Sequence, residues 1–117
     1  MATVLVVDDN DDVRQVAILA LGLSGHRTLA ASDGLEALMV YSSCRCNIDL
    51  VLTDIDMPQM NGIDLASRVR ALDPDRKILL MSGCCTADTE GARRYPFVAK
   101  PFLPHQLNAA INALLSR

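Results

Sequence analysis

The sequence has little clustered positive charge and no long hydrophobic run. Its 117 residues include 11 Lys and Arg against 14 Asp and Glu, with a formal net charge of -3. The basic residues are scattered, whereas binding to nucleic-acid phosphates needs clustered Lys and Arg, so no direct nucleic-acid contact is expected. The apolar stretch at residues 4–7 is too short for a membrane span and has no basic residue before it. We therefore expect no signal peptide, no membrane insertion and a cytoplasmic location.

The sequence also lacks a zinc-binding cysteine pattern, a linker and an internal repeat. Cys44 and Cys46 are separated by one residue, and Cys84 and Cys85 are adjacent. Neither spacing is a common zinc pattern, so these cysteines are expected to be reduced thiols. Half of the residues are hydrophobic, which is enough for a core in a chain of this length. We expect one domain over 1–117, with no output domain in this chain.

Short apolar runs alternate with segments of helical periodicity, and this alternation predicts the fold class. The predicted strands are 3–7, 27–31, 49–53, 77–82 and 96–99. A helix is predicted after each strand; the fourth is short, at about 87–93, and the last covers 103–116. Strands that are apolar at consecutive positions are typical of a sheet covered on both faces. The sequence therefore predicts an α/β fold with a doubly wound, five-stranded parallel sheet and helices on both faces.

The inner faces of the helices are predicted from apolar residues three and four positions apart. Asn10 or Asp11 is expected to cap the first helix, and Asp33 with Glu36 has the spacing of a capping box. The predicted inner-face residues are Val13, Val16, Ala17, Ala20 and Leu21; Leu35, Leu38 and Met39; Leu65, Ala66, Val69 and Leu72; and Leu103, Leu107, Ala110, Ile111 and Leu114.

Polar residues stand where four of the predicted strands end. Asp8 and Asp9 follow the first strand, and Asp54 follows the third. Ser82 closes the fourth strand, and Lys100 follows the fifth. In doubly wound sheets, ligands bind beyond the carboxyl ends of the strands. We therefore expect these side chains to meet in one pocket.

The acidic residues of this pocket call for a cation. Two carboxylates about 4 Å apart repel each other by roughly 4 kcal/mol at an effective dielectric near 20. Hard oxygen ligands suit Mg²⁺, or Mn²⁺ in its place. Lys100 adds a second positive charge and Ser82 a hydroxyl donor, an arrangement that can hold a tetrahedral dianion. Asp54, fixed by an apolar strand, is the predicted nucleophile and would form an aspartyl phosphate.

Four motifs together resemble the receiver domain of two-component response regulators. They are V-L-V-V-D-D at 4–9, D-I-D-M-P-Q-M-N-G at 54–62, M-S-G at 81–83 and K-P-F at 100–102. They occur in the order of that family and extend over nearly the whole chain. The resemblance implies a flavodoxin-like sheet with strand order 2-1-3-4-5.

The resemblance also implies a role for each residue of the pocket. Asp54 matches the phosphoacceptor, and Lys100 matches the lysine that pairs with a phosphoryl oxygen. Asp9 and Asp54 match direct ligands of Mg²⁺, with the backbone carbonyl of Asp56 as a further ligand and Asp8 acting through metal-bound water. Ser82 matches the switch hydroxyl, and Phe97 matches the aromatic residue whose rotamer follows that hydroxyl.

The implied function is that of a signalling protein that assists its own phosphorylation and dephosphorylation. The phosphoryl donor would be a histidine kinase or a histidine phosphotransfer protein. Phosphorylation would shift the surface formed by the fourth helix, the fifth strand and the last helix, and so alter binding to a downstream protein target. A weak homodimer is compatible with this reading.

Two alternatives stay open at this point. A receiver could bind its partners without being phosphorylated, although the intact acids, Ser82 and Lys100 argue against this. Asp54 and Asp56 also resemble the D-x-D signature of haloacid-dehalogenase-type phosphatases. The position of that motif after the third strand, and Pro58 within it, argue against a phosphatase.

Overall fold

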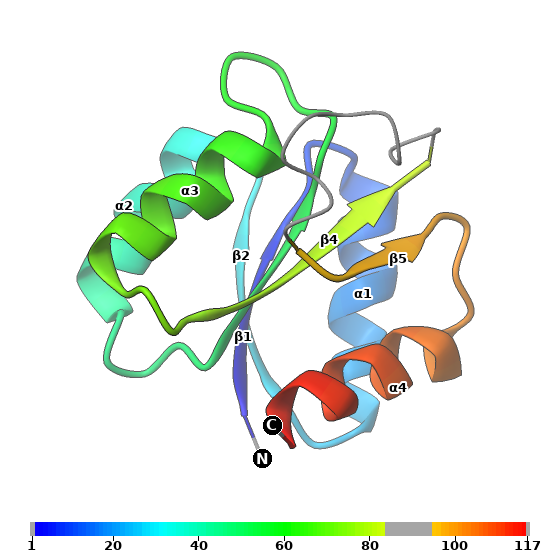
Figure 1. The fold of residues 1–117 in the computed structure, drawn as a ribbon. Helices are drawn as coiled ribbons and strands as arrows, with labels where there is room; N and C mark the ends of the chain where they lie inside the picture. Colours follow the sequence, from blue (N-terminus) through cyan, green and yellow to red (C-terminus); the bar gives the residue numbers. More distant parts are fainter. Residues whose placement is uncertain (1, 84–94, 117) are drawn as a thin grey trace.

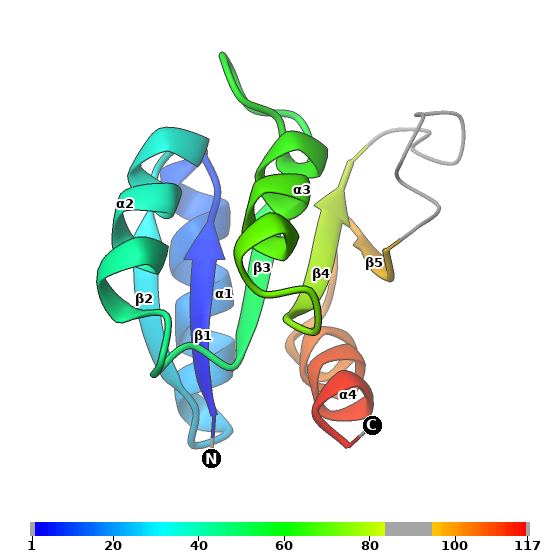
Figure 2. The ribbon, with the colours of Figure 1, turned by 60° about the vertical axis from the view of Figure 1, so that its left-hand side comes forward.

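The computed structural model describes residues 2–83 and 95–116. These residues form a parallel sheet of five strands in the order β2-β1-β3-β4-β5, as Figures 1 and 2 show. The fold class and the strand order predicted from the sequence are thereby confirmed. The strands are β1 (Thr3–Val7), β2 (Arg27–Ala31), β3 (Leu50–Asp54), β4 (Lys77–Ser82) and β5 (Phe97–Ala99).

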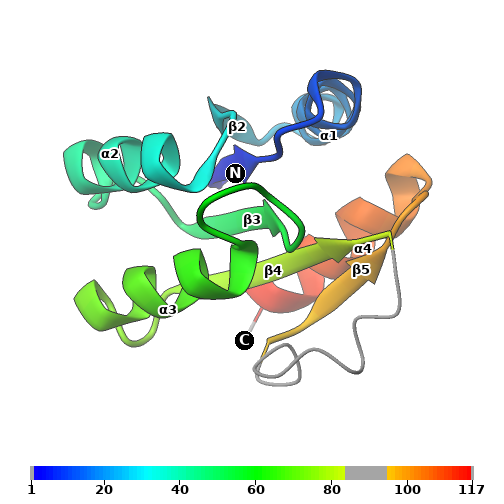
Figure 3. The ribbon, with the colours of Figure 1, turned by 90° about the horizontal axis from the view of Figure 1, so that it is seen from above.

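Helices cover both faces of the sheet. Within the described residues they are α1 (Asp11–Leu23), α2 (Gly34–Cys44), α3 (Gly62–Leu72) and α4 (Pro104–Leu115). Seen from above in Figure 3, α1 and α4 lie on one side of the strands, and α2 and α3 lie on the other. None of these helices is long and apolar enough to cross a membrane. The short helix predicted at 87–93, and Cys84 and Cys85, fall outside the described residues.

The central strands position the site because they are buried on both faces. Every residue of β3 is buried, and β1 is buried from Val4 onward. In the parallel register Val7 lies opposite Thr53, so the chain segments that follow β1 and β3 leave the sheet side by side. Strand β3 spans Leu50–Asp54 rather than the predicted 49–53, which makes Asp54 its last residue.

The prediction that Leu35, Leu38 and Met39 form the inner face of α2 is wrong in part. Leu35 and Met39 are 52% and 72% exposed, and the buried residues of α2 are Gly34, Ala37 and Tyr41. The helix is rotated about its axis relative to the prediction, because Gly34 lies directly against Met60 and the ring of Tyr41 fills the core. Val16, Leu72 and Leu103 were also expected on inner faces and are exposed.

The predicted helix caps are largely confirmed. The side chain of Asn10 accepts hydrogen bonds from the backbone N–H groups of Asp12 and Val13. Asp33 accepts from the backbone N–H of Glu36 at 2.7 Å. The carboxylate of Glu36 accepts from the backbone N–H of Ser32 at 2.6 Å, one residue before the position that a capping box predicts.

A polar network joins α2, α3 and the turn before β4. The buried hydroxyl of Tyr41 donates to the carboxylate of Asp73 and accepts from Nε of Arg76 at 2.9 Å. Arg45 donates to Asp73 at 3.0 Å. The hydrogen bond from Tyr41, together with the charges of Arg45 and Arg76, lowers the pKa of Asp73 below its ordinary value. The network anchors the α2 and α3 layer through charged hydrogen bonds.

Candidate functional site

The carboxyl ends of the strands bring the predicted site residues to one edge of the sheet. Asp8 follows β1 and is fully buried, and Asp54 ends β3 and is 5% exposed. Ser82 ends β4 and is buried. Lys100 follows β5, and its backbone N–H donates to the carbonyl oxygen of Ser82 at 2.7 Å. Residues that are far apart in the sequence therefore share one pocket.

Lys100 is the positive charge at the centre of this pocket. Its Nζ lies 2.8 Å from Oδ2 of Asp8 and 3.2 Å from Oδ1 of Asp54. Both contacts are shielded from water, which strengthens them relative to an ion pair on the surface. Lys100 thus holds the two buried carboxylates next to each other in the structure.

Three carboxylates form a cluster at the mouth of the pocket. Asp8, Asp9 and Asp54 each offer an oxygen, and these oxygens lie within 4.8 Å of one another. Asp9 is exposed and the other two are buried, so the cluster is open to solvent on one side. A set of hard oxygen donors with an open side fits Mg²⁺ or Mn²⁺. The side chain of Asp56 is exposed and is not part of this cluster.

The charges of the pocket shift the pKa of two of its members. Burial raises the pKa of Asp54, and the negative charge of Asp8 raises it further, while Lys100 acts in the opposite direction. Burial disfavours the charged form of Lys100, yet the hydrogen bond to Asp8 and the charge of Asp54 outweigh it and raise the pKa of Lys100. Asp54 is therefore a desolvated, basic carboxylate beside an ammonium group, a suitable environment for a nucleophile.

Arg14 and Asn10 support the acidic turn and were not predicted from the sequence as site residues. Nη1 of Arg14 donates to the carbonyl oxygen of Asp8 at 2.7 Å, and its Nη2 pairs with the carboxylate of Asp11. The backbone N–H of Asn10 donates to Oδ1 of Asp8 at 2.9 Å. The position of Arg14 in the first turns of α1 is the sequence signal that could have identified it.

Gly62 packs closely against the end of β3, and this contact, rather than backbone flexibility, requires a glycine. A Cβ atom on this residue would lie 2.1 Å from the carbonyl oxygen of Asp54 and 2.9 Å from the Cα of Ile55. The N–H of Gly62 donates to the carbonyl oxygen of Ile55 at 2.9 Å. A glycine at this position is therefore a packing requirement of the site.

The two residues predicted to form the switch lie on neighbouring strands. Ser82 pairs with Ala99, and Leu80 pairs with Phe97, so Phe97 lies two residues earlier along β5. Phe97 is 55% exposed, whereas Ser82 is buried. The structure thus places Phe97 on the surface and Ser82 in the interior at the end of β4.

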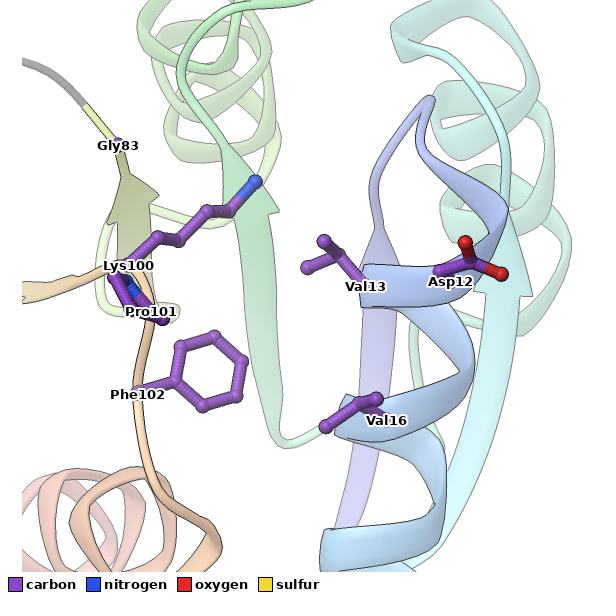
Figure 4. Close-up of a pocket in the computed structure, with 7 residues that line it drawn as sticks. All are labelled: Asp12, Val13, Val16, Gly83, Lys100, Pro101 and Phe102. Atoms are coloured by element: carbon purple, nitrogen blue, oxygen red, sulfur yellow. The ribbon is translucent and has the colours of Figure 1, made fainter.

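An apolar groove of about 510 Å³ begins at the pocket (Figure 4). Figure 4 shows Val13 and Val16 of α1 facing Lys100 and Phe102 across it. Lys100 lines the groove and also reaches Asp54, so the groove adjoins the site at this side chain. The residues that line it are Asp12, Val13, Val16, Gly83, Lys100, Pro101 and Phe102.

Comparison with known proteins agrees with this geometry. Residues 4–112 match the family described as response regulator receiver domain. The chain is 34% identical to the sensor kinase CckA of Brucella abortus, over 99% of this chain and 13% of that protein. It is 32% identical to the response regulator receiver protein CpdR of the same organism, over 98% of both.

A solved structure shows the same fold. The response regulator receiver domain protein from Clostridium thermocellum superposes with a TM-score of 0.92 and 26% identity, covering all of this chain and 96% of that one. The chain spans a small part of the sensor kinase and nearly all of CpdR, so relatives of both lengths contain this unit. The chain belongs to the response regulator receiver domain family.

Proposed function

We propose that this receiver domain accepts a phosphoryl group on Asp54 from a phosphohistidine of a histidine kinase or a histidine phosphotransfer protein. The observation that carries the proposal is the environment of Asp54: a buried carboxylate with a raised pKa, 3.2 Å from the ammonium of Lys100 and beside two further acids. A relative with the name sensor kinase supports the choice of donor.

The transfer requires little chemistry from the protein beyond positioning and charge. A carboxylate oxygen of Asp54 attacks the phosphorus, and an O–P bond forms as the N–P bond of the phosphohistidine breaks. The imidazole nitrogen keeps the electron pair of that bond and takes a proton from water. The transfer replaces the charge of the Asp54 carboxylate by the charge of the phosphoryl oxygens. Lys100, which already lies beside Asp54, would pair with one of these oxygens.

The acidic cluster would hold the divalent cation that the family uses. Asp9 and Asp54 would bind it through carboxylate oxygens, Asp56 through its backbone carbonyl, and Asp8 through a bound water. A bound Mg²⁺ or Mn²⁺ supplies charge that neutralises the phosphoryl oxygens. Arg14 and Asn10 keep the turn that carries Asp8 and Asp9 in place by the hydrogen bonds described above.

The groove beside Lys100 supports the assignment of a protein donor. Among the described residues, the acidic cluster is open to solvent at Asp9, so a phosphohistidine would reach Asp54 from that side and its donor would cover the adjoining surface. That surface is apolar on the α1 side, where Val13 and Val16 line the groove. A donor with apolar side chains next to its histidine would bury them there.

The proposed output is a conformational shift at the ends of β4 and β5, where Ser82 and Phe97 lie. The phosphoryl group carries about 1.5 to 2 negative charges in place of the single charge of the Asp54 carboxylate, and it brings strong acceptor oxygens. The buried hydroxyl of Ser82 would donate to one of these oxygens, and Phe97 on the neighbouring strand would leave its exposed position. The altered surface would then bind a downstream protein.

The proposal is tested by intact-mass spectrometry after incubation with phosphoramidate and MgCl₂. Phosphoramidate contains the N–P bond of the natural donor and needs no partner protein. We expect one adduct of about 80 Da, absent from Asp54→Asn and after addition of EDTA. The control is Asp75→Asn, which makes the same chemical change at an exposed position and should leave labelling intact.

The outcomes separate the alternatives. An adduct on the Asp54→Asn variant would refute Asp54 as the acceptor. No adduct and no phosphate release from the wild-type chain would favour a receiver that binds partners without phosphorylation. Steady phosphate release that needs Asp54 would indicate fast hydrolysis of the aspartyl phosphate.

A further inference from the structure

The loop between β3 and α3 carries Asp56, and two methionines of this loop enter the core. Figure 2 shows this loop projecting beyond the end of the sheet. Asp56, Pro58 and Gln59 are exposed, whereas Met57 and Met60 are only 8% and 7% exposed. Both methionines belong to the core between the sheet and the α2 and α3 layer. The buried side chains of Met57 and Met60 therefore hold a loop whose tip residues, Asp56, Pro58 and Gln59, face water.

The backbone of this loop contains an unfavourable turn. Gln59 has a φ of 69°, and the N–H of Met60 donates to the carbonyl oxygen of Pro58 at 2.8 Å. A hydrogen bond across three residues with a positive central φ is a γ-turn of the rare, strained kind. A non-glycine residue keeps such a conformation only when its surroundings impose it. Met60, next in the chain and buried, is the anchor that can do so.

Met60 occupies a notch in α2 that exists because residue 34 is a glycine. A Cβ on Gly34 would lie 2.9 Å from both Cβ and Sδ of Met60. The backbone of Gly34 is helical and needs no glycine, since its φ is not positive. The missing side chain is therefore explained by the methionine that lies across it. This contact joins the first turn of α2 to the loop that carries Asp56.

We infer that Met60, seated in the notch at Gly34, is a positioning residue that holds the Asp56 peptide ready for the divalent cation. This inference rests on the proposed function, because it concerns the backbone carbonyl that would bind the cation beside Asp9 and Asp54. The side chain of Met60 touches neither the cation nor the phosphoryl group. It acts through the turn at Gln59, which connects it to the chain segment of Asp56.

The test compares Mg²⁺ affinity and loop order in matched core variants. Met60→Ala empties the notch, Met60→Leu refills it, and Gly34→Ala pushes the methionine out. Leu114→Ala is the control, since Leu114 is 6% exposed in the core on the opposite face. Mg²⁺ binding is followed by titration of backbone amide signals in NMR spectra. Hydrogen exchange of the amides of Met60 and Gly62, without metal, reports the loop itself.

We expect Met60→Ala and Gly34→Ala to weaken Mg²⁺ binding by about 5- to 30-fold. This factor corresponds to the conformational entropy of one backbone residue, which a loosened loop would have to lose when the cation binds. Exchange of the two loop amides should accelerate in both variants. Met60→Leu should restore both quantities, and Leu114→Ala should lower stability without changing either. Both single changes disrupt the same contact, so their effects should not add. The double variant should bind Mg²⁺ about as tightly as the single variant that has the lower Mg²⁺ affinity.

Other results would overturn the inference. If wild type and Met60→Ala bind Mg²⁺ equally, or if Leu114→Ala weakens binding as much as Met60→Ala, Met60 is only a core residue. In either case phosphoramidate labelling of the wild type would leave the proposed function standing. If the wild type neither binds Mg²⁺ nor becomes labelled, the proposed function fails, and the inference fails with it.

Discussion

Substitution of Gly62 by Ala is the sharpest test of how the site is packed. The added Cβ would lie 2.1 Å from the carbonyl oxygen of Asp54 and 2.9 Å from the Cα of Ile55. Both neighbours are backbone atoms, so no side-chain rotation relieves the overlap. The start of α3 and the end of β3 must separate by about 1 Å to reach ordinary van der Waals contact. The displaced peptide is that of the proposed phosphoacceptor.

The expected loss of stability follows from three contributions. Forcing extra atoms into a packed site costs about 1–3 kcal/mol. The hydrogen bond from Gly62 to Ile55, 2.9 Å long, would be weakened or lost at about 1 kcal/mol. Replacing a helical glycine returns less than about 1 kcal/mol at a helix start. We therefore expect the free energy of unfolding to fall by about 1–4 kcal/mol.

Urea unfolding followed by circular dichroism measures this loss, and Gly22→Ala is the matched control. Gly22 is also helical, but a Cβ there would have no atom within 4 Å. We expect Gly22→Ala to raise stability by about 0.5–1 kcal/mol. In the folded fraction of Gly62→Ala, labelling by phosphoramidate should slow by about 100-fold, because a shift of about 1 Å misplaces the nucleophile. Equal stability of the two variants would refute the reasoning.

Three further results are expected. Tyr41→Phe removes the hydroxyl that links Asp73 to Arg76, and urea unfolding should show a loss of about 1–3 kcal/mol. Because the folded pKa of Asp73 lies below its ordinary value of 3.8, its contribution is complete above that pH and is lost as the pH falls through the folded pKa. Asp73→Asn should therefore lower stability at neutral pH and flatten the loss of stability in acid. Val16→Asp should slow phosphoryl transfer from a histidine phosphotransfer protein about tenfold but leave phosphoramidate labelling unchanged.

Each of these three results has its own check. An unfolding free energy of Tyr41→Phe equal to that of the wild type would show that the hydroxyl network adds nothing. If urea titrations of Asp73→Asn keep the acid dependence of the wild type, another carboxylate is responsible for it. Leu35→Asp is the control for Val16, since Leu35 is an exposed apolar residue on α2, away from the groove. Equal slowing in both variants would argue against a donor at the groove.

The strands and the site residues at their ends were predictable because their signal is local. A run such as residues 4–7 is apolar at consecutive positions, which is typical of a strand covered on both faces. Once the strands are parallel, the residues after them must share an edge. Asp8, Asp54 and Lys100 could therefore be placed together from the sequence, and the structure brings them within bonding distance.

The orientation of α2 and the close contact at Gly62 could not be predicted in the same way. α2 carries apolar side chains on several sides, so periodicity alone leaves its rotation about its axis open. Its rotation is set by Gly34 against Met60 and by the buried ring of Tyr41, which are contacts between distant segments. The approach of Gly62 to Asp54 likewise depends on a distance between two backbones, which residue spacing does not encode.

The ion pair between Lys100 and Asp8 joins residues 92 positions apart, and this has a consequence for folding kinetics. Chains dominated by such non-local contacts fold slowly, because loop closure costs entropy before any contact compensates for it. No early, locally folded fragment of this sheet can contain the complete pocket. Asp8 after β1 and Asp54 at the end of β3 have no contact with Lys100 until β5 has docked on β4. The ability to be phosphorylated should thus appear late and in one step during refolding, and pulsed labelling with phosphoramidate could time the arrival of the last strand.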